Sequence, residues 1–136
     1  MSDDVKATLE SFLEQVPFAQ SCGMRIVEAD ASAGTLVVEM PIADHLERQR
    51  GSGQFHGGAV ASLIDTAGTF AMIMVTGSIV STVDMRTDFL RPAVGSLRAE
   101  ARVRKAGKRI GVVDIDVTGA EDRAVAVGRG TFASVG

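Results

Sequence analysis

Residues 57–76 are the most constraining segment of this chain, because Asp65 is the only charged side chain among them. The segment has the length of a helix, and Gly77 follows it as a C-terminal stop signal. Its apolar residues cover almost the whole circumference, which is typical of a buried helix. The sequence therefore predicts a long central helix that carries one acid in apolar surroundings.

The same region raises the alternative of a membrane span, since residues 66–83 contain no charge. Glycine, serine and threonine interrupt the run, and no basic residue adjoins either end. The acidic N-terminus lacks the basic and apolar regions of a signal peptide. Cys22 is the only cysteine and has no partner for an internal disulfide. We therefore expect a soluble, cytoplasmic protein.

Alternating apolar and polar residues predict strands on both sides of the central helix. We expect a helix over 3–16 that ends at Pro17, and strands over 23–30, 34–41, 82–90, 97–105, 109–118 and 123–133. A two-residue turn at Ala106–Gly107 would mix apolar and acidic residues on one face, which predicts a bulge or a three-residue loop. This order predicts one α+β domain over residues 1–136, with an antiparallel sheet around the helix.

On a helix of 3.6 residues per turn, Asp65 shares its face with small or weakly polar neighbours. These neighbours are Ala61, Ser62, Gly68, Thr69 and Met72. Buried Asp is rare unless it is paired, and no base lies within one turn of Asp65. The acid is either a structural group satisfied by local hydrogen bonds or a member of a functional site. The pattern favours the second interpretation.

His56, Gly57 and Gly58 stand at the start of this helix. The free amides of a first turn suit a developing oxyanion. The HGG sequence alone is also compatible with an ordinary loop. With a carboxylate nine residues after His56, and Thr69 one turn further, it predicts a site that polarises an electrophile and activates water. A dimer could bring Asp65 of one subunit to Gly57 of the other.

The stretches GSGQFHGGAVASLIDTAGTFA and STVDMRTDFLRPAVG resemble the hotdog-fold acyl-CoA thioesterases, specifically the phenylacetyl-CoA thioesterase-like branch. The resemblance extends from near Met24 to Phe132. It implies a hotdog fold, in which a curved antiparallel sheet wraps around a long helix, and a homodimer or homotetramer with active sites at the dimer interface. It further implies hydrolysis of an aryl- or medium-chain acyl-CoA, with coenzyme A as part of the substrate, no separate cofactor and no metal.

The resemblance also implies a role for each motif residue. Asp65 matches the general base or nucleophile, and Thr69 matches a hydroxyl that positions the attacking water in some relatives. The amide of Gly57, helped by that of Gly58, matches the donor that polarises the thioester carbonyl. His56 matches the histidine that orients the loop or the thioester.

Gly53 is the motif glycine of this family. Many relatives carry Asn six residues before the histidine, where this chain has Arg50. Either Gln54 or another group substitutes for that Asn, or the activity is weaker or tuned to another substrate.

Coenzyme A carries phosphates, so an acidic protein of net charge −3 needs local positive charge to bind it. Residues 86–109 hold eight bases and two acids, although alternating charge is also typical of a solvated strand face. The resemblance narrows the phosphate contacts to Arg86, Lys108 and Arg109. For the acyl end we expect the small face of the central helix, with Ala61, Gly68 and Met72, together with Phe55, and Ser62 is a further substrate contact on this face.

Two other functions remain open from the sequence. A hotdog hydratase or dehydratase would pair a histidine with an acid, and His56 could serve. A non-catalytic acyl-CoA-binding protein would keep the pocket and could dispense with Asp65. A nucleic-acid or membrane partner is not expected, because the chain has no Trp or Tyr to stack on bases and its overall charge is negative.

Overall fold

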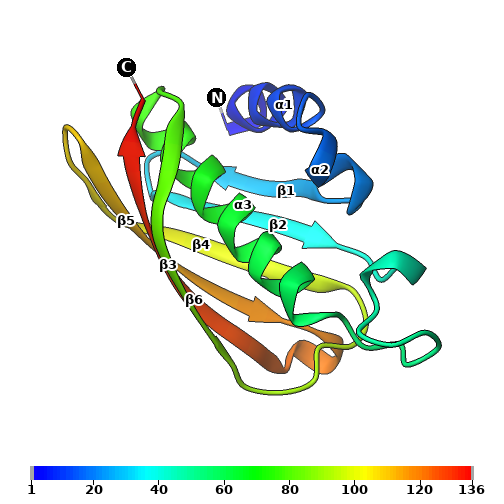
Figure 1. Cartoon of the computed structure of the whole chain (residues 1–136). Coiled ribbons are helices and arrows are strands. Elements are labelled where there is room, and N and C mark those ends of the chain that lie inside the picture. Colours follow the sequence, from blue (N-terminus) through cyan, green and yellow to red (C-terminus); the bar gives the residue numbers. More distant parts are fainter. Residues whose placement is uncertain (1, 136) are drawn as a thin grey trace.

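The computed structural model describes residues 2–135, in which a six-stranded antiparallel sheet curves around one long helix (Figure 1). The first half contains α1 (Ser2–Leu13), α2 (Pro17–Ser21), β1 (Arg25–Asp30), β2 (Thr35–Met40) and the short 3-10 helix η1 (Asp44–Leu46). The long helix α3 (Gly57–Thr76) follows. The second half contains β3 (Val80–Phe89), β4 (Leu97–Ala106), β5 (Ile110–Thr118), the 3-10 helix η2 (Ala120–Asp122) and β6 (Ala124–Ser134).

The strand order in the sheet is β1-β2-β4-β5-β6-β3, with every neighbouring pair antiparallel. The chain therefore leaves β2, crosses the inner face of the sheet as α3, and enters β3 at the opposite edge (Figure 1). This arrangement places α3 inside the curve and leaves β1 and β3 as the two edges. The predicted α+β hotdog architecture is confirmed.

Helix α3 packs closely on β6, and glycines on both elements make the approach possible. A Cβ on Gly68 would lie 2.6 Å from Phe132 of β6, and one on Gly128 would lie 2.7 Å from Ile64 of α3. The helix is long and apolar enough to cross a membrane by length and composition alone. It is instead the core helix of a soluble globular fold, with residues such as Leu63 and Ile64 fully buried. Gly77 ends it with a φ of 71°, as predicted.

Two predictions about local structure had different outcomes. The first helix ends at Leu13 rather than near residue 16, and Pro17 begins α2 instead of only stopping α1. Proline is well tolerated at the first position of a helix, where its missing N–H has no partner to lose. The predicted irregularity between β4 and β5 is confirmed, because the register shifts between Val103 and Lys105.

The two faces of the sheet differ sharply in chemistry. Toward α3 the strands present buried apolar residues, among them Ala99, Val117 and Phe132. The outer face carries ion pairs between strands. These pairs include Arg129–Asp114 at 2.6 Å, Arg102–Asp116 at 2.6 Å and Arg98–Glu28 at 2.7 Å. Alternation along each strand thus gives one face to the core and the other to solvent.

Candidate functional site

His56 forms the N-cap of α3, and its ring is held by the first turn of the helix. The Nδ1 atom accepts a hydrogen bond of 2.8 Å from the amide of Gly58. Because Nδ1 is an acceptor, the neutral ring carries its proton on Nε2. A Cβ on Gly58 would lie 2.9 Å from that Nδ1 atom, so only glycine allows this cap without a shift. The amide of Gly58 is therefore engaged by His56 and is not a second free donor.

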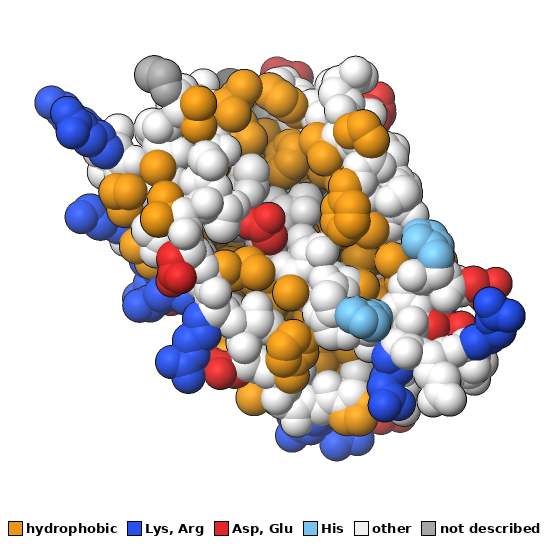
Figure 2. Space-filling model, viewed as in Figure 1, with side chains coloured by type: hydrophobic (Ala, Val, Ile, Leu, Met, Phe, Trp, Pro, Cys, Tyr) orange, Lys and Arg blue, Asp and Glu red, His pale blue; other side chains and the backbone are white. Residues whose placement is uncertain are grey.

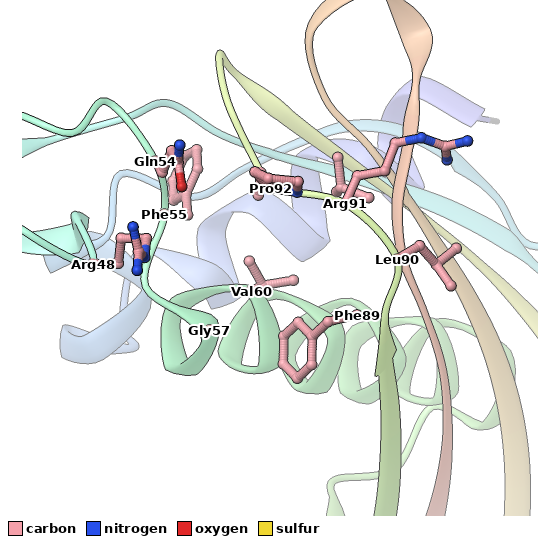
Figure 3. Close-up of a pocket in the computed structure, with 11 residues that line it drawn as sticks. Arg48, Gln54, Phe55, Gly57, Val60, Phe89, Leu90, Arg91 and Pro92 are labelled. Atoms are coloured by element: carbon pink, nitrogen blue, oxygen red, sulfur yellow. The ribbon is translucent and has the colours of Figure 1, made fainter.

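The amide of Gly57 is the free donor of this first turn. Among residues 2–135, the neighbouring amides of His56 and Ala59 have backbone partners, whereas no partner is found for that of Gly57. Gly57 also lines a hollow of about 550 Å³ with Val60 and Phe89 (Figure 3). A free N–H at a helix N-terminus beside a hollow can donate to an oxygen that gains negative charge.

Two arginines border this hollow and differ in their partners. Arg48 lines the hollow together with Gly57, whereas the guanidinium of Arg91 extends away from the helix (Figure 3). Nη1 of Arg91 donates to the carbonyl of Ala124 at 2.8 Å. Arg48 has no acidic partner within 4.0 Å in the described part of the chain. Its positive charge is therefore available to a ligand in the hollow.

The predicted residues before the helix have mainly structural contacts. Phe55 is 4% exposed, and its amide donates to Ala93. The carbonyl of Gln54 accepts from the amide of Arg48, and Gln54 lines the same hollow as Phe55. Gly53 adopts a φ of 66° and donates its amide to Glu47 at 2.5 Å. Gln54 and Phe55 thus lie at the hollow, while Gly53 shapes the loop.

Asp65 lies half-buried on the open side of α3, next to the edge strand β3. The hydroxyl of Thr82 donates to its Oδ1 atom at 2.6 Å. No Lys, Arg or His of the described residues lies within 4.0 Å of the carboxylate. Figure 2 shows that the middle of this face is largely uncharged and that Lys and Arg side chains lie at its margins. The carboxylate is therefore held by a neutral donor and not neutralised by a base.

Only part of the face predicted for Asp65 is open. Ala61, Ser62 and Thr69 are partly exposed beside it, but the hydroxyl of Ser62 donates to the carbonyl of Gly58 at 2.7 Å. The placement of Gly68 and Met72 on the open face is wrong. Their positions turn toward the sheet, where Phe132 fills the space at Gly68.

The same packing explains Met72. It is 2% exposed, and its side chain lies against Gly111 of β5. A residue buried between α3 and the sheet is not available to an acyl group on the outer side of the helix. Gly68 and Met72 are therefore core residues in this chain.

The three predicted phosphate contacts do not gather at the hollow. Arg86 lies on the outer face of the sheet, pairs with Asp88 and is 79% exposed. Lys108 and Arg109 belong to the turn between β4 and β5 and are exposed. That turn precedes Gly111, and Gly111 contacts Met72 of α3. Met72 lies about 22 Å from Gly57 along α3, at ~1.5 Å per residue. Within one chain, Lys108 and Arg109 are therefore far from the Gly57 amide, and Arg86 lies on the other face of the sheet.

Asp65 and the Gly57 amide are also separated within one chain. They are eight residues apart on α3, which corresponds to about 12 Å along the axis. Among the described residues, Asp65 lines none of the five main hollows, and no three His, Cys, Asp or Glu side chains gather as metal ligands would. The chain thus presents two candidate half-sites: an amide without a partner at the start of α3 and a carboxylate without a cationic partner among the described residues.

Comparison with known proteins identifies the family to which this chain belongs. A sequence model of the thioesterase superfamily matches residues 52–126, more than half of the chain. The chain is 32% identical to acyl-coenzyme A thioesterase PaaI of Escherichia coli, over 100% of this chain and 95% of that protein. The protein therefore belongs to the thioesterase superfamily.

Two further comparisons agree with this conclusion. Human acyl-coenzyme A thioesterase 13 is 27% identical, over 96% of this chain and 94% of its own length. The solved structure of E. coli PaaI, a protein from the phenylacetic acid degradation operon, matches with a TM-score of 0.86 and 31% identity. That match covers 99% of this chain and 96% of the other.

Sequence reasoning missed two residues of the site. Thr82 stands near the start of a predicted strand, and only the course of β3 along α3 brings it to Asp65. Arg48 lies in the polar connection before α3, outside the basic block at 86–109. Its amide donates to the carbonyl of Gln54 at 2.9 Å, and this contact folds the loop back toward the start of α3. No periodic pattern in the sequence signals either contact.

Proposed function

We propose that this protein hydrolyses an aryl- or medium-chain acyl-CoA to the free acid and coenzyme A. The observation that carries the proposal is the state of Asp65, a carboxylate on an uncharged helix face that is held by the Thr82 hydroxyl. The names of the E. coli and human relatives support acyl-CoA as the substrate class. A base without a cationic partner can accept a proton from water.

In the proposed reaction, Asp65 takes a proton from a water molecule as the water oxygen attacks the thioester carbonyl carbon. The carbonyl oxygen gains negative charge, which the Gly57 amide stabilises. The carbon–sulfur bond then breaks, and the sulfur leaves with the proton that Asp65 held. Direct attack by the Asp65 carboxylate, followed by hydrolysis of the anhydride, gives the same products.

Two further residues have supporting roles in this proposal. Thr69 lies one turn beyond Asp65 on the open side of α3, where its hydroxyl can position the water. His56 orients the first turn of α3 by accepting the Gly58 amide, and thereby aims the Gly57 N–H.

A second copy of the chain completes the proposed site, because Asp65 and Gly57 of one chain are about 12 Å apart along α3. The edge strand β3 supports a homodimer, since its residue Val83 is 59% exposed and no strand of the described chain covers this edge. An antiparallel pair of α3 helices would bring each Asp65 toward the other copy's Gly57. Two such dimers would form the homotetramer implied by the resemblance.

For the nucleotide end of coenzyme A, the position of Arg48 supports it as the first phosphate contact, because it borders the Gly57 hollow. Lys108 and Arg109 could contribute only from a second copy, whereas Arg86 pairs with Asp88 on the outer face and is not expected to contribute. Arg50 is exposed in the same loop and adds positive charge where many relatives carry Asn. A cytoplasmic location is part of the proposal and is supported by Cys22, a buried free thiol.

The test is release of free thiol from a panel of acyl-CoA esters that includes acetyl-, phenylacetyl-, decanoyl- and palmitoyl-CoA. We expect release from at least the aryl or the medium-chain ester. Hydration of crotonyl-CoA, followed in the same preparations, tests the hydratase alternative. Hydration without thiol release from any ester would contradict the proposal.

A further inference from the structure

A groove between α1 and α3 lies outside the two half-sites. It has a volume of about 360 Å³, within the range of small-molecule sites. Its lining is Asp4, Val5, Thr8, Leu9, Phe12, Ile73, Met74 and Gly77. Five of these eight residues are hydrophobic, and Asp4 is the only charged one. Such a lining suits an apolar ligand without charge.

The groove continues the open side of α3 on which Asp65 lies. Asp65, Thr69 and Ile73 follow one another at intervals of four residues, so they lie along one side of the helix. All three are partly exposed. Hydrophobic side chains gather on this part of the molecule in Figure 2. An extended chain that starts at the Asp65 carboxylate can therefore follow α3 into the groove.

Phe12 forms the wall of the groove on the α1 side. Its ring stands edge-to-face with Phe70 of α3, with centroids 6.3 Å apart, yet 41% of the residue is exposed. Met74 of α3 also lines the groove and is only partly buried. An exposed aromatic wall and a flexible thioether can adapt to a linear hydrocarbon. Covering these groups would remove apolar surface from water.

We propose that the α1–α3 groove binds the distal half of a linear acyl chain and that Phe12 and Met74 set the preferred chain length. This inference rests on the proposed thioesterase function and deepens it. Thr69 is about 6 Å from Asp65 along α3, and Ile73 is about 12 Å. Each C–C bond of ~1.5 Å advances an extended chain by roughly 1.3 Å, so a chain of about ten carbons reaches Ile73. A phenylacetyl group ends near Thr69.

The experiment measures kcat/KM for acetyl-, phenylacetyl-, hexanoyl-, decanoyl- and dodecanoyl-CoA in wild type and in Phe12→Trp. The larger ring narrows the groove. In a half-open groove, a methylene gains about half of the free energy that full burial would give. Each methylene that the narrower groove excludes should therefore lower kcat/KM roughly twofold. We expect decanoyl-CoA to lose about tenfold in kcat/KM, from three or four excluded methylenes, while phenylacetyl-CoA changes less than about twofold.

A second variant gives the opposite change. Met74→Ala widens the groove, and we expect the preferred chain to lengthen by two or more carbons. Phe18→Trp is the matched control, because Phe18 is an exposed aromatic on α2 that does not line the α1–α3 groove or the Gly57 hollow. That control should leave the chain-length profile unchanged.

The outcomes separate the two proposals. If wild type releases thiol and both groove variants keep its chain-length profile, or lose activity equally on all esters, the groove assignment is overturned while the thioesterase function stands. If wild type releases thiol from no ester, the proposed function itself fails. Opposite shifts in Phe12→Trp and Met74→Ala would establish the groove as the acyl-chain site.

Discussion

The acids on the outer face of the sheet and the acid on α3 have opposite surroundings. Asp114, Asp116 and Glu28 each pair with an arginine on another strand at 2.7 Å or less. The arginine hydrogen bond holds the pKa of Asp114 below its ordinary value. Asp65 has no such partner among the described residues and accepts only from a hydroxyl. Carboxylates of one chain thus differ in whether a base neutralises them.

On the outer face, acids form ion pairs between strands, whereas the acid on α3 is left without a basic partner among the described residues. An exposed ion pair contributes little to stability, typically ~0–1 kcal/mol. The paired base also makes the carboxylate a poorer proton acceptor. A carboxylate among small, neutral side chains keeps its capacity to accept a proton. Substitutions in one region can therefore be tested with the other region as the control.

The largest expected effect is that of Asp65→Asn. The amide cannot take a proton, so we expect kcat to fall by roughly 10²–10⁴, with the melting temperature unchanged or raised. Thiol release and thermal unfolding measure the two quantities. Asp114→Asn is the matched control and should keep full activity, since it lies on the other side of the sheet. Equal activity in Asp65→Asn and wild type would remove Asp65 from the mechanism.

The second effect concerns the amide of Gly57, the first residue of α3. Proline is tolerated at this position and deletes only the N–H, and His56 already has the extended conformation that a following proline requires, with a ψ of 139°. We expect Gly57→Pro to lower kcat by roughly 10²–10³.

Gly57→Ala is the control for this change, because it keeps the N–H and its Cβ would lie 3.5 Å from the Phe89 ring, an ordinary contact. It should stay within a few-fold of wild type. Similar rates in the proline and alanine variants would show that the polarising donor lies elsewhere.

A smaller effect is expected for the arginines. Arg48→Ala should raise KM for acyl-CoA several-fold with little change in kcat, because it removes a phosphate contact and no reacting group. Added salt should raise KM of wild type in the same way. Arg86→Ala, which removes a base on the outer face, should have no effect on KM. An increase confined to Arg86→Ala would restore the sequence-based assignment.

The smallest effect is on the outer face itself. A lowered pKa means that the Asp114 pair stabilises the fold above the ordinary pKa of 3.8 and loses this contribution as pH falls through the lower, folded-state value. We therefore expect Asp114→Asn to reduce the free energy of unfolding by about 1 kcal/mol or less near neutral pH. Urea unfolding should show this difference shrinking below pH 3.8. A difference that grows on acidification would contradict the assignment.

Much of the fold could be predicted because it depends on local patterns. The bounds of α3, its glycine stop and the strand alternation all follow from residue spacing. The bulge in β4 could be predicted because any simpler turn would turn acidic residues toward the core. The end of α1 was misplaced, since the periodic apolar positions continue to Val16 while the helix itself ends at Leu13.

The site was harder to predict, because it depends on contacts between distant segments. The helical wheel placed Ser62 and Thr69 correctly on the open side, but it also placed Gly68 and Met72 there. Both residues instead pack against the sheet. The side chain of Phe132 on β6 fills the space at Gly68, and Met72 lies against the backbone of Gly111 on β5. Thr82 reaches Asp65 only because β3 runs along α3. No pattern along the chain encodes that contact.

The central claim is that Asp65 of one copy acts with the Gly57 amide of another, and mixing two inactive variants tests it directly. Asp65→Asn and Gly57→Pro are unfolded and refolded together in equal amounts, and thiol release is compared with that of each variant alone. Random pairing in a symmetric dimer makes half of the dimers mixed, each with one intact site, so about a quarter of wild-type activity should return. Activity no higher than the mean of the two variants alone would contradict a shared site.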